Sequence, residues 1–100
     1  MEISHKEFYE ALVVAKKGVP EPLHETTAVL SYEVGRMMEQ AMYLYWFGPD
    51  KARLGFYKSE TIDAIAQLVL ICEANGWDFE EMKALGIEKA MERFTGKEKK

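Results

Sequence analysis

The chain has 100 residues, of which 48% are hydrophobic and 30% are charged, and this is the balance of one folded domain rather than of a disordered segment. Its net charge of −4 at pH 7 argues against nucleic-acid binding and against attachment to anionic membranes, because both require a basic surface. The single cysteine, Cys72, cannot form a disulfide within the chain, so we expect a protein of the reducing cytoplasm.

A capping box and a group of prolines delimit the first predicted helix. Ser4 and Glu7 have the capping-box spacing, in which each side chain satisfies a free backbone N–H of the first turn, so a helix is expected over residues 4–17. The prolines of the segment 18–23 then exclude a helix, because proline lacks the N–H and its ring clashes with the preceding turn.

Two longer helices follow in the middle of the chain. Thr26 or Thr27 is a suitable cap for a second helix, which we expect over residues 28–47. Residues 51–57 are charged and contain a glycine, so we interpret them as a connection that either holds a helical turn or forms a mobile loop. The third helix is expected over residues 59–75, where Asn-Gly is a signal for a helix end.

The last part of the chain predicts a fourth helix and a short tail. Asp78 and Glu81 form a second capping box, and apolar residues continue at helical spacing as far as Phe94. We assign residues 1–96 to a single all-α domain and residues 97–100 to a frayed basic tail.

These helices together predict a four-helix bundle that associates with itself. The segment 65–72 is apolar on nearly every side, and three short neighbouring helices do not cover such a helix in a protein of this size. We therefore expect at least a dimer, either a homodimer or a homotetramer. The aromatic run 43–47 fits packing in a core or a subunit interface better than stacking on a nucleotide base.

Three carboxylates are candidates for a metal site. Glu60 and Asp63 lie one turn apart, so their side chains share one face of the third helix. If the second and third helices pack antiparallel, Glu33 faces the same groove. Ionised carboxylates near a core need a cation, and Mg²⁺, for which Mn²⁺ can substitute, prefers such oxygen ligands. Arg36 is the competing internal cation, because its guanidinium can pair with both acids of the third helix.

Residues 30–94 resemble the MazG-like all-α nucleoside triphosphate (NTP) pyrophosphohydrolase superfamily, whose hallmark is E-E-x-x-E on one helix and E-x-x-D on the next. The E-x-x-D motif is matched by Glu60-Thr61-Ile62-Asp63. The turn into the last helix is similar over residues 74–78, and the E-K-x-x-x-R ending is similar over residues 88–93. The first motif is degenerate, since it reads Tyr32-Glu33-Val34-Gly35-Arg36 and keeps only the middle glutamate.

The resemblance implies a metal-dependent enzyme, a divergent stand-alone member of the superfamily, that hydrolyses NTP to a nucleoside monophosphate and pyrophosphate. It assigns the catalytic role and the binding of Mg²⁺ to Glu33, Glu60 and Asp63. It implies phosphate contacts for Lys89 and Arg93. Apart from the resemblance, Lys51, Arg53 and Lys58, before the third helix, form an alternative phosphate clamp on a loop that could close over a bound nucleotide. The alternative for Lys89 and Arg93 is a solvated helix end, where basic residues interact favourably with the helix dipole.

Two non-enzymatic alternatives depend on Arg36. In the first, Arg36 replaces the metal, and the protein is a helical module that binds a nucleotide or mediates oligomerisation. In the second, the protein is a helical adaptor without a ligand, and the ion pair made by Arg36 closes the groove between the second and third helices.

Overall fold

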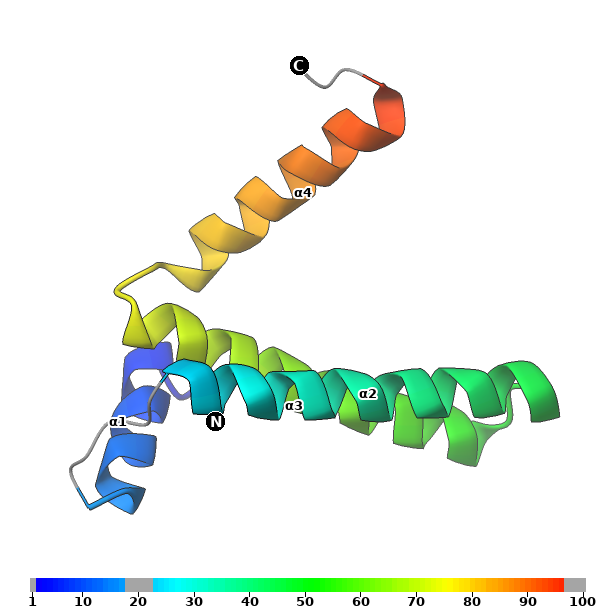
Figure 1. The fold of residues 1–100 in the computed structure, drawn as a ribbon, viewed down its shortest axis with the longest axis horizontal. Coiled ribbons are helices and arrows are strands. Elements are labelled where there is room, and N and C mark those ends of the chain that lie inside the picture. The colour runs from blue at the N-terminus through cyan, green and yellow to red at the C-terminus, as the bar shows by residue number, and fades with distance from the viewer. Residues whose placement is uncertain (1, 18–22, 97–100) are drawn as a thin grey trace.

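The computed structural model describes residues 2–17 and 23–96, and within these residues all regular structure is helical (Figure 1). The helices are α1 (His5–Ala15), α2 (Leu23–Phe47), α3 (Lys51–Ala74) and α4 (Phe79–Thr95). The prediction of an all-α fold is therefore confirmed. The connection 18–22 and the tail 97–100 lie outside the described residues. None of the described helices combines the length and the apolar character needed to cross a lipid bilayer.

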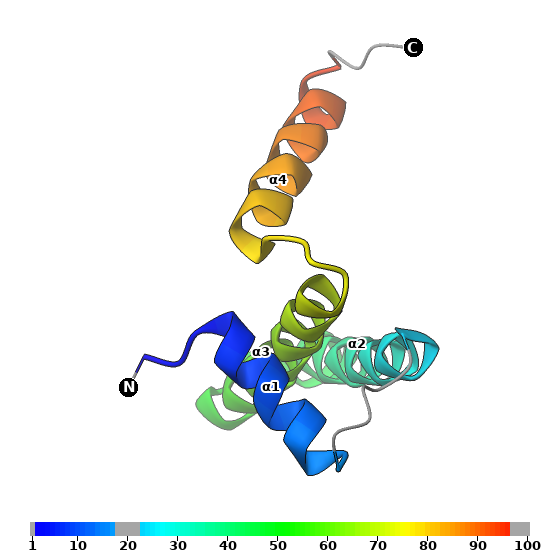
Figure 2. The ribbon, with the colours of Figure 1, turned by 90° about the vertical axis from the view of Figure 1, so that its left-hand side faces the viewer.

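An antiparallel hairpin of α2 and α3 forms the body of the molecule. The two helices have 25 and 24 residues and lie side by side, while α1 packs against α3 and α4 leaves the hairpin near the end of α3 (Figures 1 and 2). Each of the other helices contacts α3, so α3 is the central helix, as its apolar composition predicts.

The start of α2 differs from the prediction. The helix begins at Leu23, five residues before the expected start, and Thr27 lies inside it. The Thr27 hydroxyl donates a hydrogen bond of 2.8 Å to the carbonyl of Leu23, one turn back, and does not cap the helix. A threonine has both options, and the sequence pattern does not distinguish them.

The segment 51–57 is also helical, so its prediction as a connection was wrong. Asp50 caps α3, because its Oδ1 accepts a hydrogen bond of 2.8 Å from the N–H of Arg53. The Arg53 guanidinium lies 2.7 Å from Asp50 Oδ2 and donates to the carbonyl of Phe47 at the end of α2. The turn between the long helices is therefore only three residues, 48–50, and Gly48 supplies the positive φ of 88° that it requires.

The turn between α3 and α4 agrees with its sequence signals. Gly76 adopts a φ of 71°, and the N–H of Trp77 donates a 2.9 Å hydrogen bond to the carbonyl of Cys72, which closes α3. Asp78 caps α4 by accepting from the N–H of Glu81 at 3.1 Å. Cys72 is buried beside this turn, and burial is the main cause that raises the pKa of its thiol.

The core of one chain is small. Among the described residues, the buried hydrophobic ones all belong to α3: Ala64, Val69, Leu70 and Cys72. Within residues 2–17 and 23–96 no large side chain is completely buried, and most of the apolar residues of α2 and α4 remain exposed. A single copy therefore leaves much of its hydrophobic surface in contact with water, which is consistent with the expectation that α3 needs more cover than its own neighbours give.

Candidate metal centre

Three carboxylates meet where α2 crosses the middle of α3. One oxygen from each of Glu33, Glu60 and Asp63 can be chosen so that all lie within 4.8 Å of one another. Oxygens bound to one Mg²⁺ at about 2.1 Å lie about 3–4 Å apart, so small side-chain movements would bring this set to bonding distance. The antiparallel hairpin thus brings together the three residues that the sequence analysis selected.

Burial is graded across the cluster. Glu60 retains only 8% of its accessible surface, Glu33 is half-buried and Asp63 is exposed. The cluster therefore opens to the surface of the hairpin and is not enclosed in its interior. A small anionic molecule that bound a metal here would approach from the Asp63 side.

Arg36 pairs with Glu60 through a single carboxylate oxygen. Its Nε and its Nη2 each lie 3.0 Å from Glu60 Oε1. Its Nη1 donates a hydrogen bond of 2.9 Å to the hydroxyl of Tyr32, whose ring also lies under the guanidinium with 5.6 Å between Cζ and the ring centroid. Among the described residues, no ion pair links Arg36 with Asp63, so the guanidinium holds one acid of α3 rather than both.

The second oxygen of Glu60 has no partner. With the neighbouring carboxylates ionised, Oε2 is buried and accepts no hydrogen bond. A buried carboxylate oxygen without a donor or a cation is costly, typically about 1–3 kcal/mol and more for a charged group. Arg36 therefore leaves half of the Glu60 carboxylate unsatisfied, and the oxygen that remains belongs to the cluster that contains Glu33 and Asp63.

The charges of the cluster favour the binding of a cation. The pKa of Glu33 is raised, first because the carboxyl is partly desolvated and then because the charges of Asp63 and Glu60 oppose its ionisation. A proton on Glu33 is also held by a hydrogen bond to Glu60. The pKa of Arg36 is raised by its hydrogen bonds to Tyr32 and Glu60, so the guanidinium keeps its charge at every accessible pH. With all groups ionised, the cluster and Arg36 carry two net negative charges, which one divalent cation would balance.

Tyr32 is the residue that the sequence analysis missed. It precedes Arg36 by one helical turn, so the two side chains share a face of α2. The tyrosine provides both a hydrogen-bond acceptor and an aromatic face for the guanidinium. The spacing of four residues between Tyr32 and Arg36 is visible in the sequence, and it could have indicated that a residue of the same helix contacts the guanidinium.

The predicted phosphate-binding residues do not join the cluster in a single chain. Lys89 and Arg93 lie in the second half of α4, which runs away from the hairpin (Figures 1 and 2). Lys58 is exposed on α3, and its position two residues before Glu60 places it on a different side of the helix. The neighbouring Arg53, considered with Lys58 as part of a mobile phosphate clamp, is instead engaged by Asp50 and Phe47.

Comparisons of this chain with known protein families, with curated proteins and with solved structures give no match. The resemblance to the MazG-like superfamily therefore stays a prediction from the sequence motifs.

The raised pKa of Glu33 predicts how stability depends on pH in the metal-free protein. The folded state binds the Glu33 proton more tightly than the unfolded chain does, so the free energy of unfolding should fall as pH rises above the ordinary glutamate value of 4.5. The glutamine side chain of the Glu33→Gln variant cannot ionise, so this variant should lack the part of the decrease in unfolding free energy that comes from Glu33. Urea denaturation in EDTA from about pH 4 to about pH 8 measures the difference. Glu25→Gln, at the exposed start of α2, is the control, and equal slopes for wild type and Glu33→Gln would contradict the assignment.

Proposed function

We propose that this protein is a divalent-metal-dependent nucleotide hydrolase of the MazG-like type, which converts an NTP to a nucleoside monophosphate and pyrophosphate. The observation that carries the proposal is the buried Oε2 of Glu60, which has no partner and belongs to a cluster of three carboxylates. A structural ion pair would be expected to satisfy both oxygens of a buried carboxylate. An oxygen left free beside two further carboxylates suits a metal ligand.

Each residue of the cluster has a distinct part in this proposal. Glu60, the most buried, is oriented by Arg36 so that Oε2 remains for Mg²⁺ or Mn²⁺. Asp63, the most exposed, completes the site on the side from which a nucleotide would approach. Glu33 has the raised pKa, so it accepts a proton from water more readily than an ordinary carboxylate at neutral pH.

The reaction breaks the anhydride bond between the α- and β-phosphates. The oxygen of a water molecule adds to phosphorus, the bridging oxygen leaves with one of the products, and a proton of the water passes to a carboxylate of the cluster. A bound metal would supply charge neutralisation on the phosphates and would lower the pKa of the attacking water. The residues of the hairpin hold the three carboxylates in place before the substrate arrives, which reduces the rearrangement that the reaction needs.

The full proposal is a cytoplasmic enzyme that acts on a small-molecule nucleotide as a homodimer or homotetramer. A second copy would offer further basic residues to the phosphates, since Lys89 and Arg93 of the same chain lie away from the cluster. We expect no nucleic-acid partner, because the net charge of −4 disfavours contact with a phosphate backbone.

A second candidate function is favoured by the hydrogen bonds of Arg36. The guanidinium makes two contacts with Glu60 and is supported by Tyr32, as a resident cation would be. In that case the protein is a non-catalytic module that binds a nucleotide or mediates oligomerisation. The two candidates differ in whether a divalent metal binds at all.

Mn²⁺ should raise the melting temperature of the purified protein in a saturable manner. A ligand that binds only the folded state at 100 times its Kd adds about 2.7 kcal/mol, which corresponds to a rise of about 10 °C or more for a domain of this size. Asp63→Asn and Glu60→Gln should lose the shift, whereas Glu39→Gln, outside the cluster on α2, should retain it. No shift at millimolar Mn²⁺ would favour the non-catalytic module.

Replacement of Arg36 by an acid should strengthen metal binding. Arg36→Glu removes the resident positive charge and adds a carboxylate, so the affinity for Mn²⁺ measured by titration calorimetry should rise by roughly tenfold or more. Tyr32→Phe is the matched control, because it removes a support of Arg36 without a change of charge. A weaker affinity in Arg36→Glu would mean that Arg36 is needed to orient Glu60 as a ligand.

Hydrolysis should release pyrophosphate rather than inorganic phosphate. With Mn²⁺ and a panel of NTPs, an assay specific for pyrophosphate should detect turnover that Asp63→Asn lowers by about 100-fold or more. Circular dichroism should show unchanged helicity in this variant, because Asp63 is exposed. If nucleotide and metal both bind but no pyrophosphate appears, the protein is a nucleotide-binding module.

A further inference from the structure

One copy of the chain exposes more surface than a folded protein of its mass should. Its accessible surface is 7,937 Å² for a mass of 11.5 kDa. A folded monomer of this mass exposes about 5,800 Å², so the excess is roughly 2,100 Å² per chain. Two copies that each buried this excess would form an interface of roughly 4,000 Å², which lies within the range of about 2,000–5,000 Å² for obligate homodimers.

Helix α4 accounts for a large part of the uncovered surface. It touches the rest of the chain at its first turns, where the Phe79 ring packs edge-on against His5 at 5.6 Å, and where Phe79, Met82 and Lys83 line a pocket of about 330 Å³ with the end of α3. Beyond this point it extends into solvent (Figure 2). An isolated helix of 17 residues is marginal in water, so α4 needs a surface to pack against.

The rest of α4 carries an apolar stripe, defined by Ala84, Ile87, Met91 and Phe94. Their spacing of three and four residues places them on one face of the helix. All four are exposed, and Phe94 retains 82% of its accessible surface. The acids Glu81, Glu88 and Glu92 flank the stripe on one side, and Lys89 and Arg93 lie opposite it, so α4 can bury the stripe and keep these charged side chains in water.

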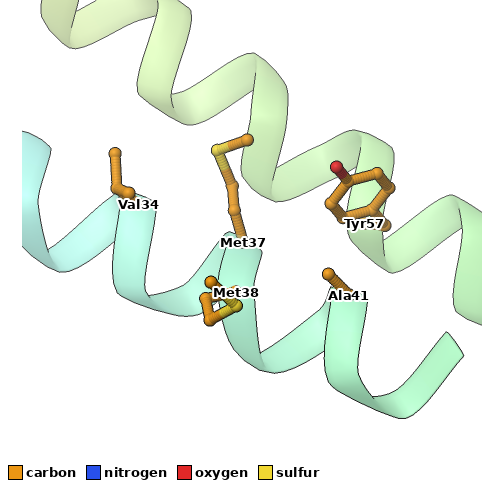
Figure 3. Close-up of a pocket in the computed structure, with 5 residues that line it drawn as sticks. All are labelled: Val34, Met37, Met38, Ala41 and Tyr57. Carbon is orange, nitrogen blue, oxygen red and sulfur yellow. The ribbon is translucent and has the colours of Figure 1, made fainter. Parts of the chain in front are cut away.

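The hairpin offers a matching groove. Val34, Met37, Met38, Ala41 and Tyr57 line a pocket of about 190 Å³ between α2 and α3 (Figure 3). Met37 and Tyr57 reach from their helices toward the space between them, and Met38 lies at its edge. Val34 and Met38 retain 50% and 62% of their accessible surface.

The groove continues along both helices at the spacing of a helix-packing seam. On α2 it extends from Val34 through Met38 and Ala41 to Tyr45, and on α3 Leu54 continues the face of Tyr57 in the same direction, toward the turn between the two helices. At 1.5 Å per residue the α2 side is about 17 Å long, and the stripe of α4 is about 15 Å long. The lengths of the two apolar surfaces therefore agree.

From this agreement and from the excess surface, we propose that α4 of one copy lies in the α2–α3 groove of a second copy, and that the exchange is reciprocal. The groove of the same chain is not reached, because the turn after α3 is fixed by the Gly76 conformation and by the Trp77–Cys72 hydrogen bond, and it directs α4 away from the hairpin (Figures 1 and 2). A reciprocal exchange is closed and two-fold symmetric, so it buries the stripe and the groove of both copies and leaves no open end for further growth.

The first test is the oligomeric state in EDTA, so that the outcome does not depend on the metal site. Light scattering should give a dimer for the wild-type chain. Met91→Glu should raise the dimer dissociation constant by at least about tenfold. Met91→Ala, which keeps a strong helix former, should weaken the dimer in the same direction. Lys89→Glu introduces the same side chain on the polar face of α4 and should leave the dimer intact. A wild-type monomer, or equal effects of Met91→Glu and Lys89→Glu, would overturn the proposal.

The second test identifies the partners across the interface. Two full-length chains in a Cys72→Ala background, one with Met38→Cys and the other with Ile87→Cys, are mixed and treated with a flexible bismaleimide. Mass spectrometry should find the covalent heterodimer as the main product. Cross-linking of the Met38→Cys chain with itself alone would indicate hairpin-on-hairpin packing and would overturn the proposal. Exclusively intramolecular cross-links in a Met38→Cys, Ile87→Cys double variant would show that α4 folds back on its own chain, and would overturn it equally.

Discussion

The antiparallel packing of α2 on α3 is the constraint on which the rest of the structure depends. A turn of only three residues joins two helices of about equal length, and Asp50, Arg53 and the carbonyl of Phe47 hold its ends together. Because the turn is short, the register of the two helices is fixed along their whole length. This register places Glu33 opposite Glu60, although 27 positions separate them in the sequence. The acidic cluster, the groove and the small core all follow from this single packing.

The buried carboxylate of Glu60 determines how the cluster is interpreted. An arginine beside a candidate metal ligand suggests at first that the metal has been replaced, but the contacts of Arg36 with Glu60 go to one carboxylate oxygen only. The guanidinium fixes the orientation of the carboxylate and removes part of its charge. The other oxygen is left without a partner in a site that already contains two more acids. An internal cation and an external one are therefore compatible here, because they would use different oxygens of the same side chain.

Local signals in the sequence predicted the parts of the fold that local interactions decide. The Ser4 cap and the Gly76–Asp78 turn each depend on residues within one or two helical turns, and both were found as predicted. The clustering of Glu60 with Asp63 follows from helical periodicity alone. The inclusion of Glu33 required the assumption that the neighbouring helices pack antiparallel, which short connections favour.

The errors arose where two local options have similar energies. Thr27 can cap a helix or bond back to the previous turn, and Asp50 and Ser59 are both good caps for α3, so the sequence did not decide where α2 and α3 begin. Whether Arg36 pairs with Glu60 or with Asp63 depends on how α2 and α3 are rotated about their axes where they pack. The spacing of residues in the sequence does not predict that rotation. The caps on either side of the turn predict where α3 ends and α4 begins, but they do not predict that α4 leaves its own hairpin, which follows from the backbone conformation at Gly76 and Trp77.

Cys72 is buried beside the turn into α4, so the rate at which its thiol reacts reports local opening of the structure around it. A thiol that is shielded from water and has a raised pKa is almost unreactive toward disulfide reagents while the surrounding structure is closed. Because Cys72 lines the pocket between the end of α3 and the start of α4, its reaction requires a further opening of that pocket, and when closing is fast the observed rate gives the equilibrium constant of that opening. Because the chain contains no other cysteine, a single exponential in thiol labelling would measure how firmly the turn between α3 and α4 is held, without any probe having to be introduced.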